Sequence, residues 1–460
     1  MRLAFLDRLE ELSRLRALYA RRERSVAVLY GRRRCGKSRL LLETLPERRA
    51  IYYVADDRES TLQRVALAAE IARLLPGFDQ VTYPDWDALL ARTWAEAPPG
   101  TVLVIDEFPA LVSVAPEVPS LLQKFIDRRR PGGPHLVLTG SSQRMMQGLI
   151  LDRSAPLYGR AAEILKIAPL PCGWIRKALH LRDDRAAIEA YAIWGGIPRY
   201  WELAADFSDQ QEAVQALALS PLGVLYDEPS RLLLDDLRDV TQAASILTLI
   251  GQGCHRLSEI AGRLGKPATS LSRPLERLLN LGLVRRDVPF GASPRDTKRS
   301  LYRIADPFLS FWFRYIEPNR SRLEARQIQT VSREIQARFA QQVAQVWEVL
   351  VRDSVPRRRY FNRTWGEARS WWGPGRDRSP LEIDLVAEST DGTALLLGEV
   401  KWSTTPDPDR LWASLQRKAK NFPLGEGRKV FLGLWMPTAT GRRRRGVRCF
   451  GPQEVLRALR

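Results

Sequence analysis

Short apolar runs alternate with amphipathic runs over the first part of the chain. The apolar runs have the length and composition of buried strands and cover residues 26–30, 51–54, 101–105 and 135–138. Helix-like runs separate them. Strands that alternate with helices are typical of a mostly parallel sheet wrapped by helices. The pattern therefore predicts an α/β fold for residues 1–170.

The pattern becomes mainly helical after Pro171, and we expect residues 171–238 to form a helical lid. Its one sharp break is Gly195-Gly196-Ile197-Pro198, where two glycines and a proline predict a stiff turn between helices. A plain stop and restart of the helix fits the same residues.

Residues 239–318 carry the pattern of a winged helix. Helical runs cover residues 243–250, 257–264 and 270–281, and a hairpin follows from residue 283. The apolar positions on one face of the third run are Leu271, Leu275, Leu278 and Leu279. The cations expected to reach a DNA groove are Arg273, Arg277, Arg295, Lys298 and Arg299. A winged helix that only packs between domains is the alternative.

A long helical passage at 322–351 leads into a last region of strands, and residues 319–460 are expected to form a further α/β domain. Apolar runs at 382–387 and 394–401 are joined by a turn that contains Asp391-Gly392, a strong hairpin signal.

The first candidate site lies directly after the strand-like run at 26–30. Residues 31–38 read Gly-Arg-Arg-Arg-Cys-Gly-Lys-Ser and fit the phosphate-loop pattern G-x-x-x-x-G-K-[ST] at every fixed position. Glycines let backbone N–H groups turn toward phosphates, and the start of the next helix adds partial positive charge. Lys37 is expected to reach the β- and γ-phosphates, and Ser38 to ligate Mg²⁺. A Gly- and Arg-rich surface turn is the alternative.

A second motif supports the first. The run at 101–105 ends in Asp106 and Glu107, and ligands collect at the carboxyl ends of parallel strands. Asp106 is expected to hold the water shell of Mg²⁺, and Glu107 to orient or deprotonate the attacking water. Ser141, at the end of the next strand, would either sense the γ-phosphate or, with Ser142, cap the following helix.

A second constellation of charged residues lies near the C-terminus. Glu399 and Lys401 are two residues apart and project from one sheet face, where Asp384 of the neighbouring strand can meet them. Glu348, on a helix upstream, could add a carboxylate. Two or three carboxylates and a lysine are suited to hold Mg²⁺ and to stabilise charge at a phosphate. This is the restriction-endonuclease-like pattern PD-(D/E)XK, and such folds often survive as binding modules without catalysis.

The composition and net charge of the chain indicate which kind of partner it binds. The chain has 460 residues, 45% of them hydrophobic and 27% charged, so it is globular and spans about three domains. A net charge of +19 and a pI near 10.2 favour binding of DNA, with Arg357-Arg358-Arg359 and residues 442–445 as the densest runs. A compositional bias toward arginine is the alternative.

Other function classes are excluded or left open. No apolar stretch approaches the roughly 18 residues of a membrane span, and early acids argue against a secretory signal, so we expect a cytoplasmic protein. The cysteines Cys35, Cys172, Cys254 and Cys449 are scattered, which indicates neither disulfides nor zinc. The sequence is also compatible with a homo-oligomer.

The motifs together resemble a prokaryotic, mostly archaeal, P-loop ATPase family of the AAA and STAND group, with a nuclease-like C-terminal domain of unassigned function. They run from Phe5-x-Asp7-Arg8 through the phosphate loop, Ile105-Asp106-Glu107, Leu157-Tyr158-Gly159-Arg160, Gly195-Gly196-Ile197-Pro198, Asp306-Pro307-Phe308-Leu309-Ser310-Phe311-Trp312-Phe313 and Trp371-Trp372 to Gly398-Glu399-Val400-Lys401-Trp402. Leu9 departs from related boxes, which usually place an acid there.

The resemblance implies further roles. Pro198 would contact the adenine and couple nucleotide state to the winged helix, and Arg160 would sense the γ-phosphate, a structural salt bridge being its alternative. The residues expected to bind the nucleotide are Gly31, Arg34, Cys35, Gly36, Lys37, Ser38, Arg39, Ser141 and Pro198.

The sequence thus predicts a switch that binds and hydrolyses ATP with Mg²⁺ and acts on DNA. In this interpretation residues 1–170 are the ATPase core, followed by the lid, the winged helix and the nuclease-like domain. The alternatives are a nucleotide-gated scaffold with an inactive nuclease fold, and a DNA-binding regulator in which ATP is only a structural ligand.

Overall fold

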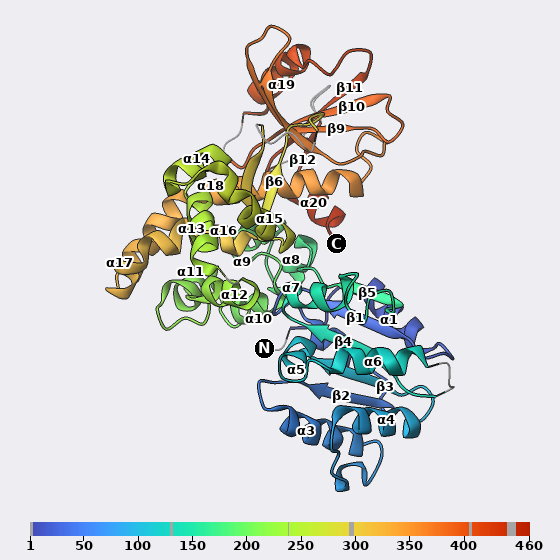
Figure 1. Cartoon of the computed structure of the whole chain (residues 1–460). Helices are drawn as coiled ribbons and strands as arrows, with labels where there is room; N and C mark the ends of the chain where they lie inside the picture. The colour runs from blue at the N-terminus through green and yellow to red at the C-terminus, as the bar shows by residue number, and fades with distance from the viewer. Residues whose placement is uncertain (1–2, 129–131, 238, 294–298, 404–406, 439–447) are drawn as a thin grey trace. The chain divides into compact units, whose positions relative to one another are not determined.

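The computed structural model describes residues 3–128, 132–237, 239–293, 299–403, 407–438 and 448–460. The chain divides into two compact units (Figure 1). The first unit comprises residues 6–169 and 234–236, and the second comprises the other residues. One border between the units lies between Pro169 and Leu170.

The first unit is built on a five-stranded parallel sheet with the order β2-β3-β4-β1-β5. Its strands are β1 (Val26–Tyr30), β2 (Ala50–Val54), β3 (Val102–Asp106), β4 (His135–Gly140) and β5 (Glu163–Lys166). Four of them lie where the apolar runs predict strands. The short edge strand β5 has no long apolar run and was not predicted. The α/β fold of this region is confirmed.

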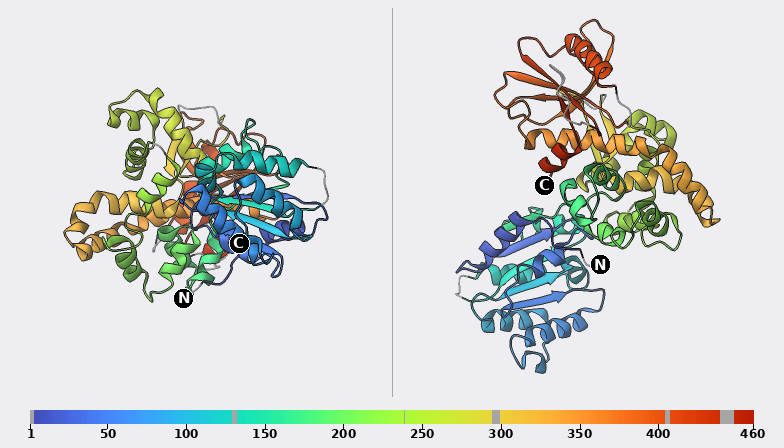
Figure 2. Two further views of the ribbon diagram at one scale, coloured as in Figure 1. Left: turned by 60° about the horizontal axis from the view of Figure 1, so that its bottom comes forward. Right: turned by 180° about the vertical axis from the view of Figure 1, so that it is seen from behind.

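Both faces of this sheet are buried. Val28, Leu103 and Ile105 lie in one hydrophobic cluster with residues of α3 to α6, and the alternating positions Ala27 and Val104 are buried as well. Figures 1 and 2 show helices on both faces. The helices of this unit are α1 (Leu9–Tyr19), α2 (Lys37–Leu42), α3 (Ser60–Ala72), η1 (Phe78–Gln80), α4 (Trp86–Glu96), α5 (Phe108–Val114), α6 (Val118–Asp127), α7 (Gln143–Met146) and η2 (Gln147–Leu151).

The second unit begins with short helices. They are η3 (Cys172–Trp174), α8 (Ile175–Ala178), α9 (Asp184–Trp194), α10 (Pro198–Ala204), α11 (Gln210–Val214), η4 (Gln215–Leu219) and α12 (Glu228–Asp236), whose last residues belong to the first unit. Gly195 ends α9 with φ of 59°, a left-handed value that favours glycine, and Pro198 starts α10. The predicted turn between helices is confirmed.

Three helices and a two-stranded antiparallel hairpin follow, and we call residues 239–306 the helix–hairpin segment. Its elements are α13 (Val240–Gly251), α14 (Leu257–Leu264), η5 (Ala268–Leu271), α15 (Ser272–Asn280), β6 (Val284–Asp287) and β7 (Leu301–Ile304). Leu271, Leu275 and Leu278 are buried, whereas Arg273 and Arg277 are exposed. Arg295 and Lys298 of the predicted hairpin tip lie outside the described residues, and Arg299 donates to the Trp372 carbonyl at 2.7 Å.

Helices then lead to a mixed sheet. They are α16 (Pro307–Phe311), η6 (Trp312–Ile316), η7 (Glu317–Asn319), α17 (Arg320–Glu324), α18 (Ile328–Ser354) and η8 (Val355–Arg357). The sequence predicted one helical passage at 322–351, but Arg326 has φ of 59° and separates α17 from α18.

The C-terminal sheet has the order β12-β11-β10-β9-β8, with β8, β9 and β10 antiparallel and β10, β11 and β12 parallel. Its elements are β8 (Arg369–Pro374), β9 (Pro380–Glu388), β10 (Ala394–Val400), α19 (Pro408–Asn421), β11 (Lys429–Trp435), β12 (Cys449–Phe450) and α20 (Pro452–Ala458). Leu415 of α19 packs with Ile383 and Leu395 of the sheet. The predicted hairpin of β9 and β10 is confirmed.

Candidate functional site

The phosphate loop of the first unit turns from β1 into α2 and needs its glycines. Gly31 has φ of 147° and Gly36 has φ of 89°. A Cβ on Gly31 would lie 2.3 Å from the carbonyl oxygen of Ile167, closer than any side chain tolerates. The loop backbone therefore takes a path that only glycine allows at this position.

Lys37 is buried beneath the loop at the start of α2. Its Nζ donates to the carbonyl oxygens of Gly31 at 2.9 Å and Arg32 at 3.2 Å. Burial lowers the pKa of Lys37, while the carboxylates of Glu107 and Asp106 act in the opposite direction. Among the residues that the structure describes, these two carbonyls are the hydrogen-bond acceptors of this desolvated ammonium, which is therefore suited to receive an anion.

Asp106, at the carboxyl end of β3, meets the first residues of α2. Its Oδ2 accepts hydrogen bonds from the hydroxyl of Ser38 at 2.8 Å and from the hydroxyl of Tyr52. Burial and the charge of Asp106 raise the pKa of Tyr52, so this hydroxyl stays a donor. A hydroxyl beside a carboxylate fits Mg²⁺, which prefers oxygen ligands and keeps several waters. Tyr52 was missed, because only its phenol tip reaches the site from the neighbouring strand.

Glu107 follows directly and has φ of 52°. Its Oε2 accepts from the backbone N–H of Ser141 at 3.1 Å and from the Ser141 hydroxyl at 3.0 Å. Ser142 accepts from the N–H of Met145 and caps α7. The two serines therefore have different contacts, since Ser141 binds the Glu107 carboxylate and Ser142 caps the helix.

Arg8 links the phosphate loop to the rest of the unit. The side chain is 7% exposed, and its Nη2 donates to the carbonyl oxygens of Cys35, at 3.4 Å, and Ala168. Its Nη1 bonds Glu11 at 3.1 Å. The Phe5-x-Asp7-Arg8 box thus holds the loop from the start of α1. Cys35 is 1% exposed, so it offers its backbone and not its thiol.

Two arginines predicted to bind the nucleotide lie in the phosphate loop or directly after it. Arg34 has φ of 67°, and Arg39 lies on α2 one residue beyond Ser38.

One residue implied by the resemblance lies away from the loop within the first unit. Arg160 forms a double hydrogen bond with Asp127, at 2.8 and 2.7 Å. It lines a cavity with Val26 and Leu136, at the amino-terminal ends of β1 and β4, whereas the phosphate loop lies at the carboxyl ends. The salt bridge with Asp127 is the alternative that the sequence left open for this residue, and its role as a γ-phosphate sensor stays a prediction. Pro198 belongs to the second unit, and its contact with adenine stays a prediction.

The C-terminal constellation comes together around lysines. Lys401 Nζ lies 2.8 Å from Asp384 and 2.9 Å from Glu399, and Lys418 of α19 lies 2.8 Å from Glu399. Asp384 also accepts from the N–H of Val400 at 2.9 Å. Although burial acts against it, these carboxylates raise the pKa of Lys401 above its ordinary value. Lys418 was missed because it comes from the following helix.

Glu348 does not complete a ligand set with Asp384 and Glu399. Burial, and then the charge of Asp384, raise the pKa of Glu348, and its ion pair is with Arg352 at 3.6 Å. No group of three or more His, Cys, Asp or Glu side chains suited to a metal is found in the described part of the chain. The predicted three-carboxylate metal site is therefore not preformed, since lysine ammonium groups lie against two of its members.

The chain matches two protein families. Residues 5–203 match a family described as an ATPase domain predominantly from Archaea, and residues 312–418 match one described as archaeal and bacterial proteins of unknown function. An uncharacterized protein of Methanocaldococcus jannaschii is 29% identical over 438 residues, which cover 93% of this chain and 94% of that protein.

The chain is also similar to solved structures. A Walker-type ATPase of Pyrococcus abyssi matches with a TM-score of 0.52 and 21% identity, over 67% of this chain and 96% of that one. The ORC2 protein of Aeropyrum pernix matches with a TM-score of 0.45 and 14% identity, over 72% and 96%. The family match over residues 5–203 and the fold of the Pyrococcus abyssi structure show that the chain carries a P-loop domain of the ATPase type. None of the helices in the described ranges is long and apolar enough to cross a bilayer.

Proposed function

We propose that the protein is a switch that binds and hydrolyses ATP. The observation that carries this proposal is the assembly of Lys37, Ser38 and Asp106 around one glycine loop, with Ser38 and Asp106 joined at 2.8 Å. Phosphate contacts satisfy the buried ammonium of Lys37, whose hydrogen bonds to the described part of the chain go to two loop carbonyls. Glu107, beside Asp106 and held by Ser141, orients or deprotonates water.

The metal fits the same residues. Mg²⁺, when bound, neutralises charge on the β- and γ-phosphates. Ser38 would ligate it directly and Asp106 through water, because a hydroxyl and a carboxylate already share one point. Tyr52 keeps Asp106 oriented when the Ser38 hydroxyl turns to the metal.

Steady-state ATP hydrolysis and nucleotide binding by calorimetry test this function. The wild type should bind ATP and turn it over, Lys37→Ala should lose most binding, and Glu107→Gln should keep binding while turnover falls at least a hundredfold. No uptake of ATP or ADP by folded wild type would end the proposal. Binding without turnover in the wild type would favour ATP as a structural ligand.

We further propose DNA as the partner of the second unit. Three helices followed by an antiparallel hairpin support a winged helix in the helix–hairpin segment, and Arg273 and Arg277 stand exposed on its third helix. The net charge of +19 supports the same partner. Binding to duplex DNA should weaken steeply with salt. Arg273→Gln with Arg277→Gln should weaken it about tenfold, while Arg333→Gln on exposed α18 should not.

A specific observation favours the second candidate, a scaffold with an inactive nuclease fold. Asp384 and Glu399 are already neutralised by Lys401 and Lys418. The nuclease alternative draws on the register of β9 and β10, which places Asp384 opposite the Glu399-x-Lys401 strand. A supercoiled-plasmid assay with Mg²⁺ or Mn²⁺ decides between them. Cleavage lost in both Asp384→Ala and Lys401→Ala supports the nuclease, and no wild-type cleavage supports the scaffold.

A further inference from the structure

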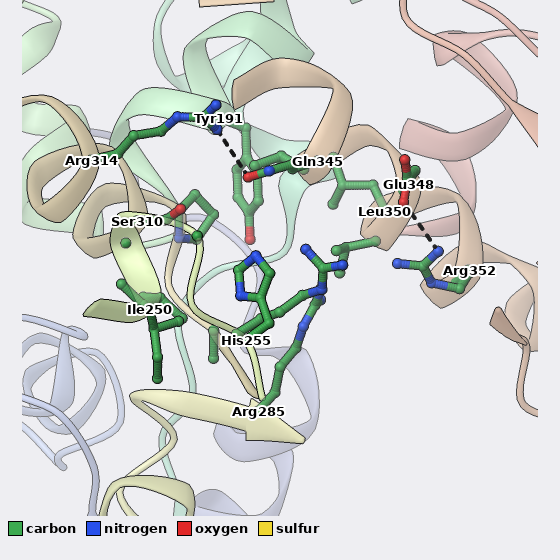
Figure 3. A pocket seen from close by; sticks show the side chains of 18 of the residues that line it. Tyr191, Ile250, His255, Arg285, Ser310, Arg314, Gln345, Glu348, Leu350 and Arg352 are labelled. Atoms are coloured by element: carbon green, nitrogen blue, oxygen red, sulfur yellow. Dashed lines mark hydrogen bonds and ion pairs between the residues drawn. The ribbon is translucent and has the colours of Figure 1, made fainter. Parts of the chain in front are cut away.

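A cavity of about 400 Å³ lies within the second unit, and no residue of the phosphate loop lines it (Figure 3). Its walls come from the helix–hairpin segment, from α9, from α16 and η6, and from the second half of α18. We call it the arginine cavity, because Arg285, Arg303, Arg314 and Arg352 all line it. Its volume lies in the range of small-molecule sites.

Two of these arginines present donors that the protein leaves unused. The Nε atoms of Arg285 and Arg303 each lie 3.3 Å from Asp287, which therefore holds both guanidinium groups side by side. Arg285 Nε is buried and has no hydrogen-bond partner of good geometry. Within the described ranges, the terminal nitrogens of both side chains have no protein acceptor. Each guanidinium thus offers free N–H groups toward the cavity.

The crowding of positive charge calls for an anion. Burial lowers the pKa of Arg285, with Asp287 opposing and Arg352 and Arg303 adding to the effect. Three carboxylates face these four arginines, namely Glu348 and Asp353 of the lining and Asp287 beside Arg285 and Arg303, so one positive charge is left over. One of these acids, Glu348, is already paired with Arg352 at 3.6 Å.

His255 and Tyr191 complete the polar wall. His255 Nδ1 donates to the Tyr302 carbonyl oxygen at 3.1 Å, since a carbonyl can only accept. Nδ1 therefore carries the proton, and in the neutral ring Nε2 is an acceptor. Figure 3 shows the side chains of Tyr191, His255 and Arg285 converging on one space. Ile250 and Leu350, both nearly buried, supply apolar surface beside them.

We propose that the arginine cavity binds a phosphate ester about the size of a mononucleotide. Paired guanidinium groups match phosphate oxygens, and the two rings and the aliphatic side chains suit the remainder of such a ligand. A volume of about 400 Å³ is too small to hold a length of duplex. The proposal does not depend on ATP binding at Lys37, because it concerns other residues in the other unit.

A ligand in the arginine cavity would change the electrostatics at Asp384, Glu399 and Lys401. Glu348 lines the cavity and interacts electrostatically with Asp384 and Lys401. Arg352 lines it too and donates to the Asp384 carbonyl at 3.0 Å. A ligand phosphate competes with Glu348 for Arg352, so it would alter the charge beside Asp384.

Calorimetry on the full chain carrying Lys37→Ala tests the site, with AMP, dAMP, inorganic phosphate and a duplex oligonucleotide as probes. We expect a mononucleotide to bind at least tenfold more tightly than inorganic phosphate. Arg285→Gln and Arg303→Gln should each weaken mononucleotide binding at least tenfold. The two substitutions are made in separate proteins, so that the test can still be read if one of them does not fold. Arg333→Gln, an exposed arginine of α18 that does not line the cavity, should leave it unchanged.

Three results would overturn the proposal. They are no binding of either mononucleotide at millimolar concentration, binding that neither arginine substitution weakens, and equal affinity for inorganic phosphate and mononucleotide. Duplex binding that depends on Arg285 and Arg303, with no mononucleotide binding, would assign these arginines to DNA backbone phosphate instead.

Discussion

The carboxylate of Glu107 accepts two hydrogen bonds from Ser141, one from the backbone N–H at 3.1 Å and one from the hydroxyl at 3.0 Å. The pair joins the ends of two neighbouring strands, β3 and β4. Because the backbone donor persists in any variant, the hydroxyl is the part that mutation can remove. Its loss frees the carboxylate to rotate away from the water that it must orient.

We expect Ser141→Ala to lower ATP turnover about tenfold with little change in ATP affinity, since general-base positioning contributes to the chemical step. Ser141→Thr keeps the hydroxyl and should retain most activity. Turnover that rises in Ser141→Ala would mean that the bond restrains Glu107 in an unproductive position. Steady-state rates at saturating ATP separate the two results.

Tyr52 should set the metal dependence. It shares Asp106 Oδ2 with Ser38, so Tyr52→Phe removes one of the two hydroxyls that orient this carboxylate. We expect the Mg²⁺ concentration for half-maximal hydrolysis to rise about tenfold, as is typical of groups that orient metal ligands. Tyr53→Phe is the matched control, because the Tyr53 hydroxyl bonds Gln63 instead. An equal effect in both variants would contradict the assignment.

The sequence predicted those site residues whose positions follow from a local motif or from the end of a strand. The phosphate loop fixes Lys37 and Ser38, and the end of a buried strand fixes Asp106. Tyr52 and Lys418 could not be predicted, because each reaches its site from another element by the tip of a long side chain. No local pattern encodes which element packs beside which.

The position of Arg160 could not be predicted for a related reason. A short motif shows that an arginine follows a glycine turn, but not toward which edge of the sheet the chain has turned. The acceptor that decides its place, Asp127, lies 33 residues upstream.

Gly31 should be irreplaceable. Alanine at this position would combine strain at φ of 147° with a Cβ 2.3 Å from the Ile167 carbonyl. We expect Gly31→Ala to lower the free energy of unfolding by about 3 kcal/mol, or to displace the loop and abolish ATP binding. Gly148→Ala is the control, since a Cβ there meets nothing within 4 Å. Urea unfolding with and without ATP measures both; a fully stable Gly31→Ala variant with normal ATP affinity would refute the geometry.

Arg160 should be dispensable for chemistry within one chain. Its partner Asp127 is half exposed, so the salt bridge contributes at most about 1 kcal/mol. We expect Arg160→Gln to leave ATP affinity and turnover within twofold of wild type at low protein concentration, in contrast to Lys37→Ala. Turnover should be measured across a range of protein concentrations. A large loss that emerges only at high concentration would place Arg160 at the nucleotide site of a neighbouring copy, whereas a loss at every concentration would return it to its own site and contradict the position beside Asp127.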